Sequence, residues 1–342
     1  GAAPEDAGSL DDVPDPFRFG PFKNYDCRSL PIETMRGCRH GCRFCYYKKG
    51  SVKLRYFSEE RVKRWIDHGL RESRAREIYL MDPTFGSDRR RSASLCRYIT
   101  ENNESGKEFH TEIRAEEVDA EFAALMSGAN IKTVEVGLQS TDPEVLKKCG
   151  GPVDMARLRE GLSCLRKAGV KTELQLIAGM PGDSESSFLR SLNEAVSLDP
   201  DTLFCFRLLV LPGTYFHDHA EELGIVHEGC PPWRVMSTRE IDFPGMTRIM
   251  RCSKYASLLF SRCRLTTKYI LAEIKRDIAS VAYEWAGEPD GKILDEPTGP
   301  GTQEIVLSEL IPSKLEKLCR DNNADFNFYR SIMIKEYGTK TE

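Results

Sequence analysis

The chain has 342 residues, of which 40% are hydrophobic and 30% are charged, and its formal net charge at pH 7 is −4. This balance is typical of a folded globular protein and argues against a disordered chain and against a general nucleic-acid binder. The sequence shows neither an apolar run long enough to cross a membrane nor a signal peptide, so we expect a cytoplasmic protein without membrane contact.

Prolines and acidic residues dominate residues 1–29, which we predict to be a linker-like segment. Strand and helix patterns then alternate as far as about residue 230. The predicted strands are residues 31–35, 77–81, 108–113, 133–138, 171–178 and 202–211. The predicted helices are residues 58–70, 88–102, 120–128, 154–168 and 184–197. Because single helices separate these strands, residues 30–230 are predicted to form an α/β fold, a partial (βα)6 barrel like a TIM barrel.

The strand pattern stops beyond about residue 230. Four further helices are predicted at residues 245–260, 269–285, 312–323 and 326–337, with a polar loop at residues 287–304. We therefore expect residues 231–342 to form a mainly helical extension that covers one opening of the barrel and helps to enclose a substrate.

Four successive predicted strands carry polar side chains on one face and apolar side chains on the other. The polar set is His110, Glu112, Arg114, Glu135, Gly137, Gln139, Glu173, Gln175, Cys205 and Arg207. The apolar set is Phe109, Ile113, Val134, Val136, Leu138, Leu174, Leu176, Ala178, Phe204, Phe206, Leu208 and Val210. Because side chains alternate along a strand, the apolar set should face the helices and the polar set should line a cavity inside the barrel. Edge strands that face water are the alternative.

Two charged residues of the polar set are candidates for catalysis or substrate binding. Arg207 alternates with Phe204 and Phe206, so it is predicted to point into the barrel, where Glu135 faces the same space. A buried guanidinium needs an acidic or ligand partner, because an unpaired charge is costly to bury. A purely structural ion pair is the alternative.

Three cysteines lie close together in the stretch "ETMRGCRHGCRFCYYKKG", at Cys38, Cys42 and Cys45. In a reducing compartment, clustered thiols favour a metal centre over disulfides. Structural zinc is one alternative, with His40 or Cys27 as the fourth ligand. A [4Fe–4S] cluster is the preferred interpretation, because three thiolates hold three irons and leave the fourth iron open to another molecule.

The residues around these cysteines suit a cluster. Gly37 and Gly41 permit the bends that wrap a loop around it, and Phe44 and Tyr46 can shield its edge.

The CxxxCxxC loop after the first strand of a βα barrel resembles the radical S-adenosylmethionine (SAM) superfamily, over roughly residues 30–215. The resemblance implies that the open iron is chelated by SAM. One electron from the cluster would cleave SAM to methionine and a 5′-deoxyadenosyl radical, which would abstract a substrate hydrogen.

Two further segments extend this resemblance to SAM-binding residues. "YLMDPTF" stands where the family grips the SAM amino group, which implies this role for Asp82 or Thr84, or for backbone carbonyls beside them. "EVGLQS" resembles the ribose-binding segment, which implies contacts from Gln139 and Ser140.

Two more positions complete the implied SAM site. "LIAGMPGD" resembles the segment that flanks adenine, which implies contacts from Ile177 and Gly179. Arg114 could pair with the methionine carboxylate, or alternatively form a structural pair with Glu112 or Glu135.

The nearest resemblance is to the radical SAM core of the subgroup with an N-terminal cobalamin-binding domain, through "LDDVPDPF", "ETMRGC" and "VLPGT". Only about thirty residues precede the first strand, so cobalamin is possible but unsupported. The leading hypothesis is a radical SAM enzyme that dehydrates, epimerises, dehydrogenates or rearranges a polar small molecule. The alternatives are a cobalamin-dependent methyltransferase or cyclase core, and a non-catalytic iron–sulfur or zinc scaffold.

The resemblance also implies an electron donor. Residues 36–64 contain ten Lys and Arg and two acidic residues, a surface that suits an acidic flavodoxin or ferredoxin. An ordinary solvated helix face is the alternative.

Overall fold

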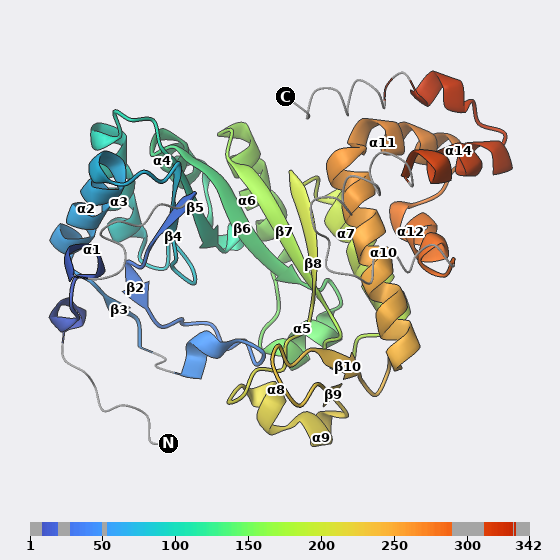
Figure 1. Cartoon of the computed structure of the whole chain (residues 1–342), viewed down its shortest axis with the longest axis horizontal. Coiled ribbons are helices and arrows are strands. Elements are labelled where there is room, and N and C mark those ends of the chain that lie inside the picture. The colour runs from blue at the N-terminus through green and yellow to red at the C-terminus, as the bar shows by residue number, and fades with distance from the viewer. Residues whose placement is uncertain (1–8, 20–27, 50–52, 289–310, 331, 333–342) are drawn as a thin grey trace. The chain divides into compact units, whose positions relative to one another are not determined.

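A computed structural model gives the structure of the chain and describes residues 9–19, 28–49, 53–288, 311–330 and 332. Six strands form one sheet in the order β1-β4-β5-β6-β7-β8 (Figure 1). They are β1 (Ser29–Ile32), β4 (Glu77–Leu80), β5 (Glu108–Ile113), β6 (Ile131–Gln139), β7 (Lys171–Ala178) and β8 (Thr202–Arg207). The pairs β1–β4, β4–β5 and β5–β6 are parallel. The predicted α/β fold on a six-stranded parallel sheet is thereby confirmed.

The chain divides into two compact units, which are described separately. The first unit comprises Gly1–Leu138, Cys149–Leu174 and Leu211–Asp218. The second unit comprises Gln139–Lys148, Gln175–Val210 and His219–Glu342. The boundaries predicted from the sequence, near residues 30 and 230, stay a prediction.

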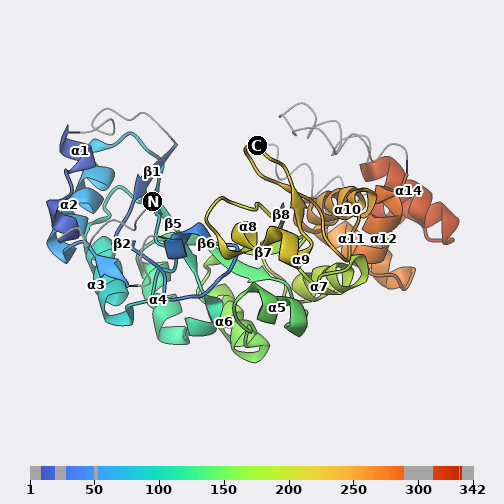
Figure 2. The same ribbon diagram turned by 90° about the horizontal axis from the view of Figure 1, so that it is seen from below.

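Four main helices lie along one face of the strands of the first unit (Figures 1 and 2). They are α2 (Glu59–Asp67), α3 (Arg89–Asn102), α4 (Ala120–Gly128) and α6 (Met155–Lys167). A side-chain oxygen of the preceding residue accepts a hydrogen bond from a first-turn N–H of each helix. These capping residues are Ser58, Asp88, Asp119 and Asp154. Short sequence signals therefore fix where each helix begins.

The remaining elements of the first unit are short. They are the 3-10 turns η1 (Leu10–Asp12), η3 (Tyr46–Lys49) and η5 (Ala115–Glu117), the π-helical turn η4 (His68–Glu72), and the helices α1 (Pro16–Phe19) and α8 (Tyr215–Asp218). The predicted first strand is two strands, because β1 ends at Ile32 and β2 (Met35–Arg36) then pairs antiparallel with β3 (Arg55–Tyr56).

Burial alternates along β5 and β6 as the sequence predicts. Phe109 and Ile113 of β5 are buried under the helices, whereas His110 and Glu112 between them are only half-buried. On β6, Glu135 likewise lies on the half-buried face. The polar face predicted for these two strands is confirmed.

The second unit is mostly helical after β8. Its helices are α5 (Pro143–Cys149), which runs to the boundary of the unit, α7 (Glu185–Ser197), α9 (Ala220–Leu223), α10 (Phe243–Arg262), α11 (Arg264–Glu273), α12 (Ile278–Ala286) and α14 (Ile311–Asp321). Two short strands, β9 (Val226–His227) and β10 (Val235–Ser237), pair antiparallel. Helix α10 packs against β8, α7 and α12 (Figure 1), and Tyr255 of α10 meets Trp285 of α12 edge-on, with ring centroids 5.7 Å apart. No helix among the described residues is both long and apolar enough to span a membrane.

The structure divides one of the predicted C-terminal helices and describes only part of another. Residues 269–285 are not one helix, because α11 ends at Glu273, Lys275 adopts a left-handed φ of 55°, and Asp277 caps α12. Residues 326–330 are helical as predicted. Residues 331 and 333–337 of the predicted last helix, and residues 289–304 of the predicted loop, lie outside the described residues.

Strand β8 presents the opposite face from the predicted one. Phe204 and Phe206 are 37% and 47% exposed, and their rings stack with centroids 6.0 Å apart. Cys205 between them lies on the other face, where burial raises the pKa of its thiol to about 12, and β8 packs against α10. The face that carries Cys205 and Arg207 is therefore turned toward α10, and the prediction that Phe204 and Phe206 face the helices is wrong.

Candidate active site

The three clustered cysteines lie in the loop that follows β2 in the first unit. Cys38, Cys42 and Cys45 are half-buried free thiols, and the N–H of Cys45 donates to the carbonyl of Cys42 at 3.2 Å. Burial raises the pKa of the Cys45 thiol, and the nearby Cys42 and Cys38 raise it further. Thiols this close together would repel one another as thiolates, so they suit a shared cation.

A cavity of about 370 Å³ opens at this loop within the first unit. Its lining residues are Gly41, Cys42, Arg43, Cys45, Gly213, Thr214 and Tyr215. Two of the three clustered thiols, Cys42 and Cys45, line this cavity. Three neighbouring thiols form the donor set of an iron–sulfur cluster, and Cys38, Cys42 and Cys45 would hold it. Of the two fourth ligands in the zinc alternative, His40 has its Nε2 3.8 Å from Oε1 of Glu117, and Cys27 lies outside the described residues.

Asp82 fixes the chain just before the cysteine loop. Its carboxylate is only 2% exposed and accepts hydrogen bonds from the N–H and hydroxyl of Thr34, at 2.8 and 2.5 Å, and from the N–H of Met35 at 3.2 Å. Burial raises the pKa of Asp82 to about 6. The hydroxyl of Thr84 donates to the carbonyl of Pro83 at 2.5 Å. Both predicted side chains are engaged within the protein, and backbone carbonyls beside them could accept hydrogen bonds from the SAM amino group, so contacts of this segment with SAM stay a prediction.

The loop is fastened on its other side by the segment after α5. The N–H of Arg43 donates to the carbonyl of Cys149 at 2.8 Å. A Cβ on Gly150 would lie 2.3 Å from the carbonyl oxygen of Gly41, so only glycine permits this approach. Gly150 was not among the predicted site residues, although the pair Gly150-Gly151 is visible in the sequence as a signal for close backbone contact.

Aromatic side chains surround the loop unevenly. The Phe44 ring packs 6.5 Å from Phe216, whereas Tyr46 is 53% exposed. The phenol of Tyr47 was not predicted to contribute to the site. Burial, reinforced by the charge of Glu112, raises the pKa of Tyr47 to about 12. Tyr47 therefore stays neutral and can donate a hydrogen bond near the cysteines.

A continuous polar face runs across β4, β5, β6 and the first half of β7. The Tyr79 hydroxyl donates to Glu112 at 2.8 Å, and the Tyr79 ring lies 4.9 Å from the His110 ring. Nε2 of His110 lies 3.1 Å from Oε1 of Glu135. Burial raises the pKa values of Glu112 and Glu173, and Glu135 raises the pKa of His110. The sequence pattern identified the acidic residues but missed Tyr79, which shares its strand parity with Glu77.

Arg114 has a different partner from the two that were predicted. Its guanidinium pairs with Glu116 at 2.6 Å, and both side chains are largely buried. Strand β5 ends at Ile113, so Arg114 lies at the start of η5 and leaves the parity of the strand. The predicted pairing with Glu112 or Glu135 is wrong, whereas a contact with the SAM carboxylate stays a prediction.

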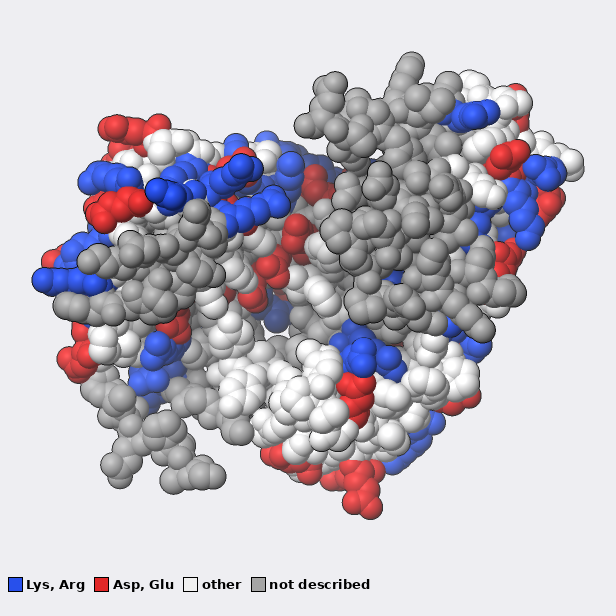
Figure 3. All heavy atoms as spheres, viewed as in Figure 1, with Lys and Arg blue, Asp and Glu red and all other residues white. Residues whose placement is uncertain are grey.

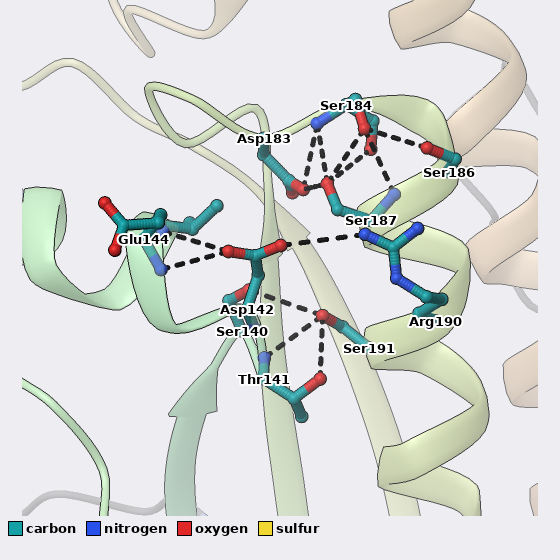
Figure 4. A network of polar contacts seen from close by, with 11 residues as sticks. Ser140, Thr141, Asp142, Glu144, Asp183, Ser184, Ser186, Ser187, Arg190 and Ser191 are labelled. Carbon is teal, nitrogen blue, oxygen red and sulfur yellow. Dashed lines mark hydrogen bonds and ion pairs between the residues drawn. The ribbon is translucent and has the colours of Figure 1, made fainter.

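Ser140 belongs to a hydroxyl network in the second unit (Figure 4). Its hydroxyl lies 3.3 Å from that of Ser191 on α7 and accepts from the N–H of Asp142 at 3.1 Å. The Ser191 hydroxyl also accepts from the N–H of Thr141 at 3.0 Å. Gln139, with a left-handed φ of 62°, marks the turn that leads from β6 into this network. The network joins residues 140–142, which follow β6, to α7 within the second unit, and ribose contacts from Gln139 and Ser140 stay a prediction.

The adenine-flanking segment predicted at the end of β7 is tightly packed. Ile177 is half-buried, and Gly179 has a φ of 86°. A Cβ on Gly179 would lie 2.6 Å from Val235 and 2.9 Å from Met246, so a side chain here would collide with β10 and α10. Gly179 is thus required by the packing of the second unit, and its contact with adenine stays a prediction.

Arg207 is held by the backbone of β10. Its Nε donates to the carbonyl of Val235 at 2.6 Å, and burial lowers the pKa of its guanidinium. Because its face of β8 is turned toward α10, the prediction that Arg207 points into the barrel is wrong. Its role in binding stays untested.

A parallel β/α sheet together with a loop of three clustered thiols, two of which line a cavity, is the arrangement expected of an iron–sulfur protein of the partial-barrel class. The profile of the Radical SAM superfamily matches residues 32–195. Residues 32–195 of the chain therefore carry a radical SAM domain, and members of that superfamily use a [4Fe–4S] cluster and SAM together with an electron donor.

Similar proteins agree with this assignment. A probable threonylcarbamoyladenosine tRNA methylthiotransferase from Pyrococcus horikoshii is 25% identical over 197 residues, which are 54% of this chain and 45% of that protein. The radical SAM methyltransferase TsrM from Kitasatospora setae shares the fold, with a TM-score of 0.54 and 19% identity over 62% of this chain and 43% of that chain. The cobalamin-dependent enzyme OxsB matches 91% of this chain and 58% of its own, with a TM-score of 0.55 and 15% identity. The chain spans about half the length of the curated relatives it matches.

Proposed function

We propose that this radical SAM enzyme abstracts a hydrogen atom from a polar small molecule bound at the polar face of the first unit. The half-buried carboxylates of Glu112 and Glu135 carry this proposal, because desolvated acids favour hydroxyl or amine groups over a lipid chain. Glu112 is close enough to Cys45 to raise the pKa of its thiol, so the polar face reaches the cysteine loop. Dehydration, epimerisation, dehydrogenation or rearrangement of the substrate would each follow from such a step.

The residues of the candidate site have separate roles in this proposal. When bound at Cys38, Cys42 and Cys45, the cluster and SAM supply the radical chemistry. Glu135 would accept hydrogen bonds from the substrate. Tyr79 would keep Glu112 oriented through its 2.8 Å hydrogen bond. A fixed orientation matters because radical chemistry needs the reacting atoms within contact distance and water kept out.

The class of substrate can be tested with cluster-loaded protein, dithionite and SAM. The release of 5′-deoxyadenosine should rise with a polar metabolite fraction and not with a lipid extract. Stimulation by the lipid extract alone would overturn the proposal. Glu135→Gln should keep its cluster but lose the stimulation by the polar fraction. The control Glu108→Gln, which changes an exposed acid on the same sheet, should keep that stimulation.

A cobalamin-dependent methyltransferase or cyclase is the second candidate. The likeness to OxsB over 91% of this chain, helical extension included, favours it. Anaerobic incubation of the chain with hydroxocobalamin, followed by gel filtration, should then give a complex with a corrin absorption band. A chain that emerges without corrin would favour the first candidate.

We further propose flavodoxin or ferredoxin as the electron donor, although the predicted basic surface is weaker than its composition implies. Figure 3 shows lysine and arginine side chains interspersed with acidic ones over the part of the first unit that carries α2 and α3. Arg36 pairs with Glu33 at 2.9 Å, and Arg64 pairs with Glu60 at 2.7 Å. Added salt should therefore slow reduction by flavodoxin only moderately, and more than it slows reduction by dithionite.

A further inference from the structure

Three potential metal ligands meet on neighbouring strands, apart from the cysteine loop. They are His110 on β5, Glu135 on β6 and Glu173 on β7, all in the first unit. One ligand atom from each of the three side chains lies within 4.8 Å of the others. Donor atoms about 2.0–2.2 Å from a shared metal ion lie roughly 3–3.5 Å apart, so small side-chain rotations would close the site.

We infer that His110, Glu135 and Glu173 bind a divalent cation that accepts both imidazole and carboxylate ligands, such as Mn²⁺, Fe²⁺ or Zn²⁺. These donors are nitrogen and oxygen, whereas the cysteine loop offers sulfur, so a metal that thiolates bind weakly, such as Mn²⁺, distinguishes the two sites. Metal binding at this triad does not depend on which reaction the enzyme performs.

One nitrogen of the His110 imidazole, Nε2, is left unsatisfied in the cluster of the three ligands. Nε2 is fully buried, yet within the described parts of the chain it has no hydrogen-bond partner. Oε1 of Glu135 lies 3.1 Å away as an ion-pair partner, and a metal ion could take its place in front of Nε2. A buried donor or acceptor without a partner is costly, and a metal ion in front of Nε2 would satisfy it.

The charge balance of the polar face also calls for a cation. Glu112 and Glu77 lie near the triad. The charge of Glu135 adds to the raised pKa of Glu112, and the charge of Glu77 raises the pKa values of His110 and Glu173. Among the described residues, neither Glu112 nor Glu173 forms an ion pair with a lysine or arginine. A divalent cation would balance the charges of Glu112 and Glu173, which have no such partner among the described residues.

The scaffold holds the ligands in place. His110 and Glu135 project from the same face of paired strands, and Glu135 is in register with Glu112, two residues beyond His110. The Tyr79 ring packs beside the His110 ring, with centroids 4.9 Å apart, and restricts its rotation. Ligands on adjacent strands vary little in position, which favours metal binding by lowering its entropic cost.

Mn²⁺ is the most direct probe, because thiolates bind it weakly and free Mn²⁺ has a strong electron paramagnetic resonance signal. Anaerobic protein with an oxidised, diamagnetic [4Fe–4S] cluster should remove the free signal of one Mn²⁺ per chain at sub-millimolar concentrations. His110→Ala and Glu173→Gln should each weaken this binding by at least about tenfold. The matched control Glu108→Gln, an exposed acid on β5, should bind as the wild type does.

A second measurement needs no variant. Pulsed electron paramagnetic resonance of Mn²⁺ bound to the wild type should show coupling to an imidazole ¹⁴N nucleus. The inference is overturned if the wild type leaves the free Mn²⁺ signal unchanged, if bound Mn²⁺ shows no ¹⁴N coupling, or if folded, cluster-loaded His110→Ala and Glu173→Gln bind like the wild type.

Discussion

Replacing Gly150 by alanine should damage the cysteine loop without touching a cysteine. Gly150 has a φ of 116°, which costs an L residue about 1–3 kcal/mol. The new Cβ would also lie 2.3 Å from the Gly41 carbonyl oxygen and 3.1 Å from Cα of Cys42. Ordinary contact requires the two backbones to separate by about 1 Å. The added methyl group therefore strains its own backbone and pushes the loop that carries Cys42.

The expected result is a lower melting temperature and a smaller iron and sulfide content after reconstitution, measured by circular dichroism and by chemical analysis. Gly151→Ala is the matched control, because a Cβ at Gly151 meets nothing within 4 Å. The proposed support of the loop by this segment is refuted if Gly150→Ala has the melting temperature and the iron and sulfide content of the wild type. It is also refuted if Gly151→Ala loses as much of both as Gly150→Ala does.

Three further predictions concern single side chains. Alanine at Cys38, Cys42 or Cys45 should abolish both the visible absorbance of the cluster and SAM cleavage, and continued cleavage by the triple variant would reject the assignment. The pKa of Asp82 is raised from 3.8 to about 6, so the folded state binds its proton more tightly than the unfolded state. The free energy of unfolding should therefore fall by up to about 3 kcal/mol as the pH rises from about 4 to about 6. Urea titrations should lose this slope in Asp82→Asn, and an unchanged slope would contradict the attribution. Arg207→Gln should lower the free energy of unfolding by about 1–3 kcal/mol through the lost bond to Val235, with SAM cleavage per folded molecule unchanged. Normal stability with SAM cleavage uncoupled from product would instead restore its predicted place in the substrate pocket.

The fold could be predicted where polar and apolar residues alternate between clear end signals. Strand β7 has the predicted bounds, because glycines at 169 and 179 flank a strictly alternating run. Strand β8 was predicted with its faces reversed, because alternation shows that two faces differ and not which of them is covered. Aromatic Phe204 and Phe206 suggested a buried face, yet β8 is the last strand of the sheet and α10 covers its other side.

The sequence predicted the cysteine loop itself, but not the partners of the charged residues around it. Cysteine spacing is a local property, so the thiol loop could be recognised from the sequence alone. The partners of Asp82 and Arg114 depend on which backbone groups and acids come near after folding. Thr34 is 48 residues from Asp82 and donates two hydrogen bonds to its carboxylate. Glu116 reaches Arg114 only because the chain turns at the end of β5. Sequence patterns list such charges but do not pair them.

The fastening of the cysteine loop bears on how the enzyme is assembled. Asp82 holds one flank, Arg43 and Gly150 hold the other, and Arg39 ties the middle to Glu117 at 2.6 Å. None of these contacts involves a thiol. Small zinc fingers gain their folding free energy from the metal, whereas here the conformational entropy of the loop is lost when the protein folds. Iron and sulfide can then bind to a cysteine loop that already has its final conformation. Oxidative loss of the cluster should leave a folded protein that can be refilled, so damage by oxygen becomes a reversible interruption of activity.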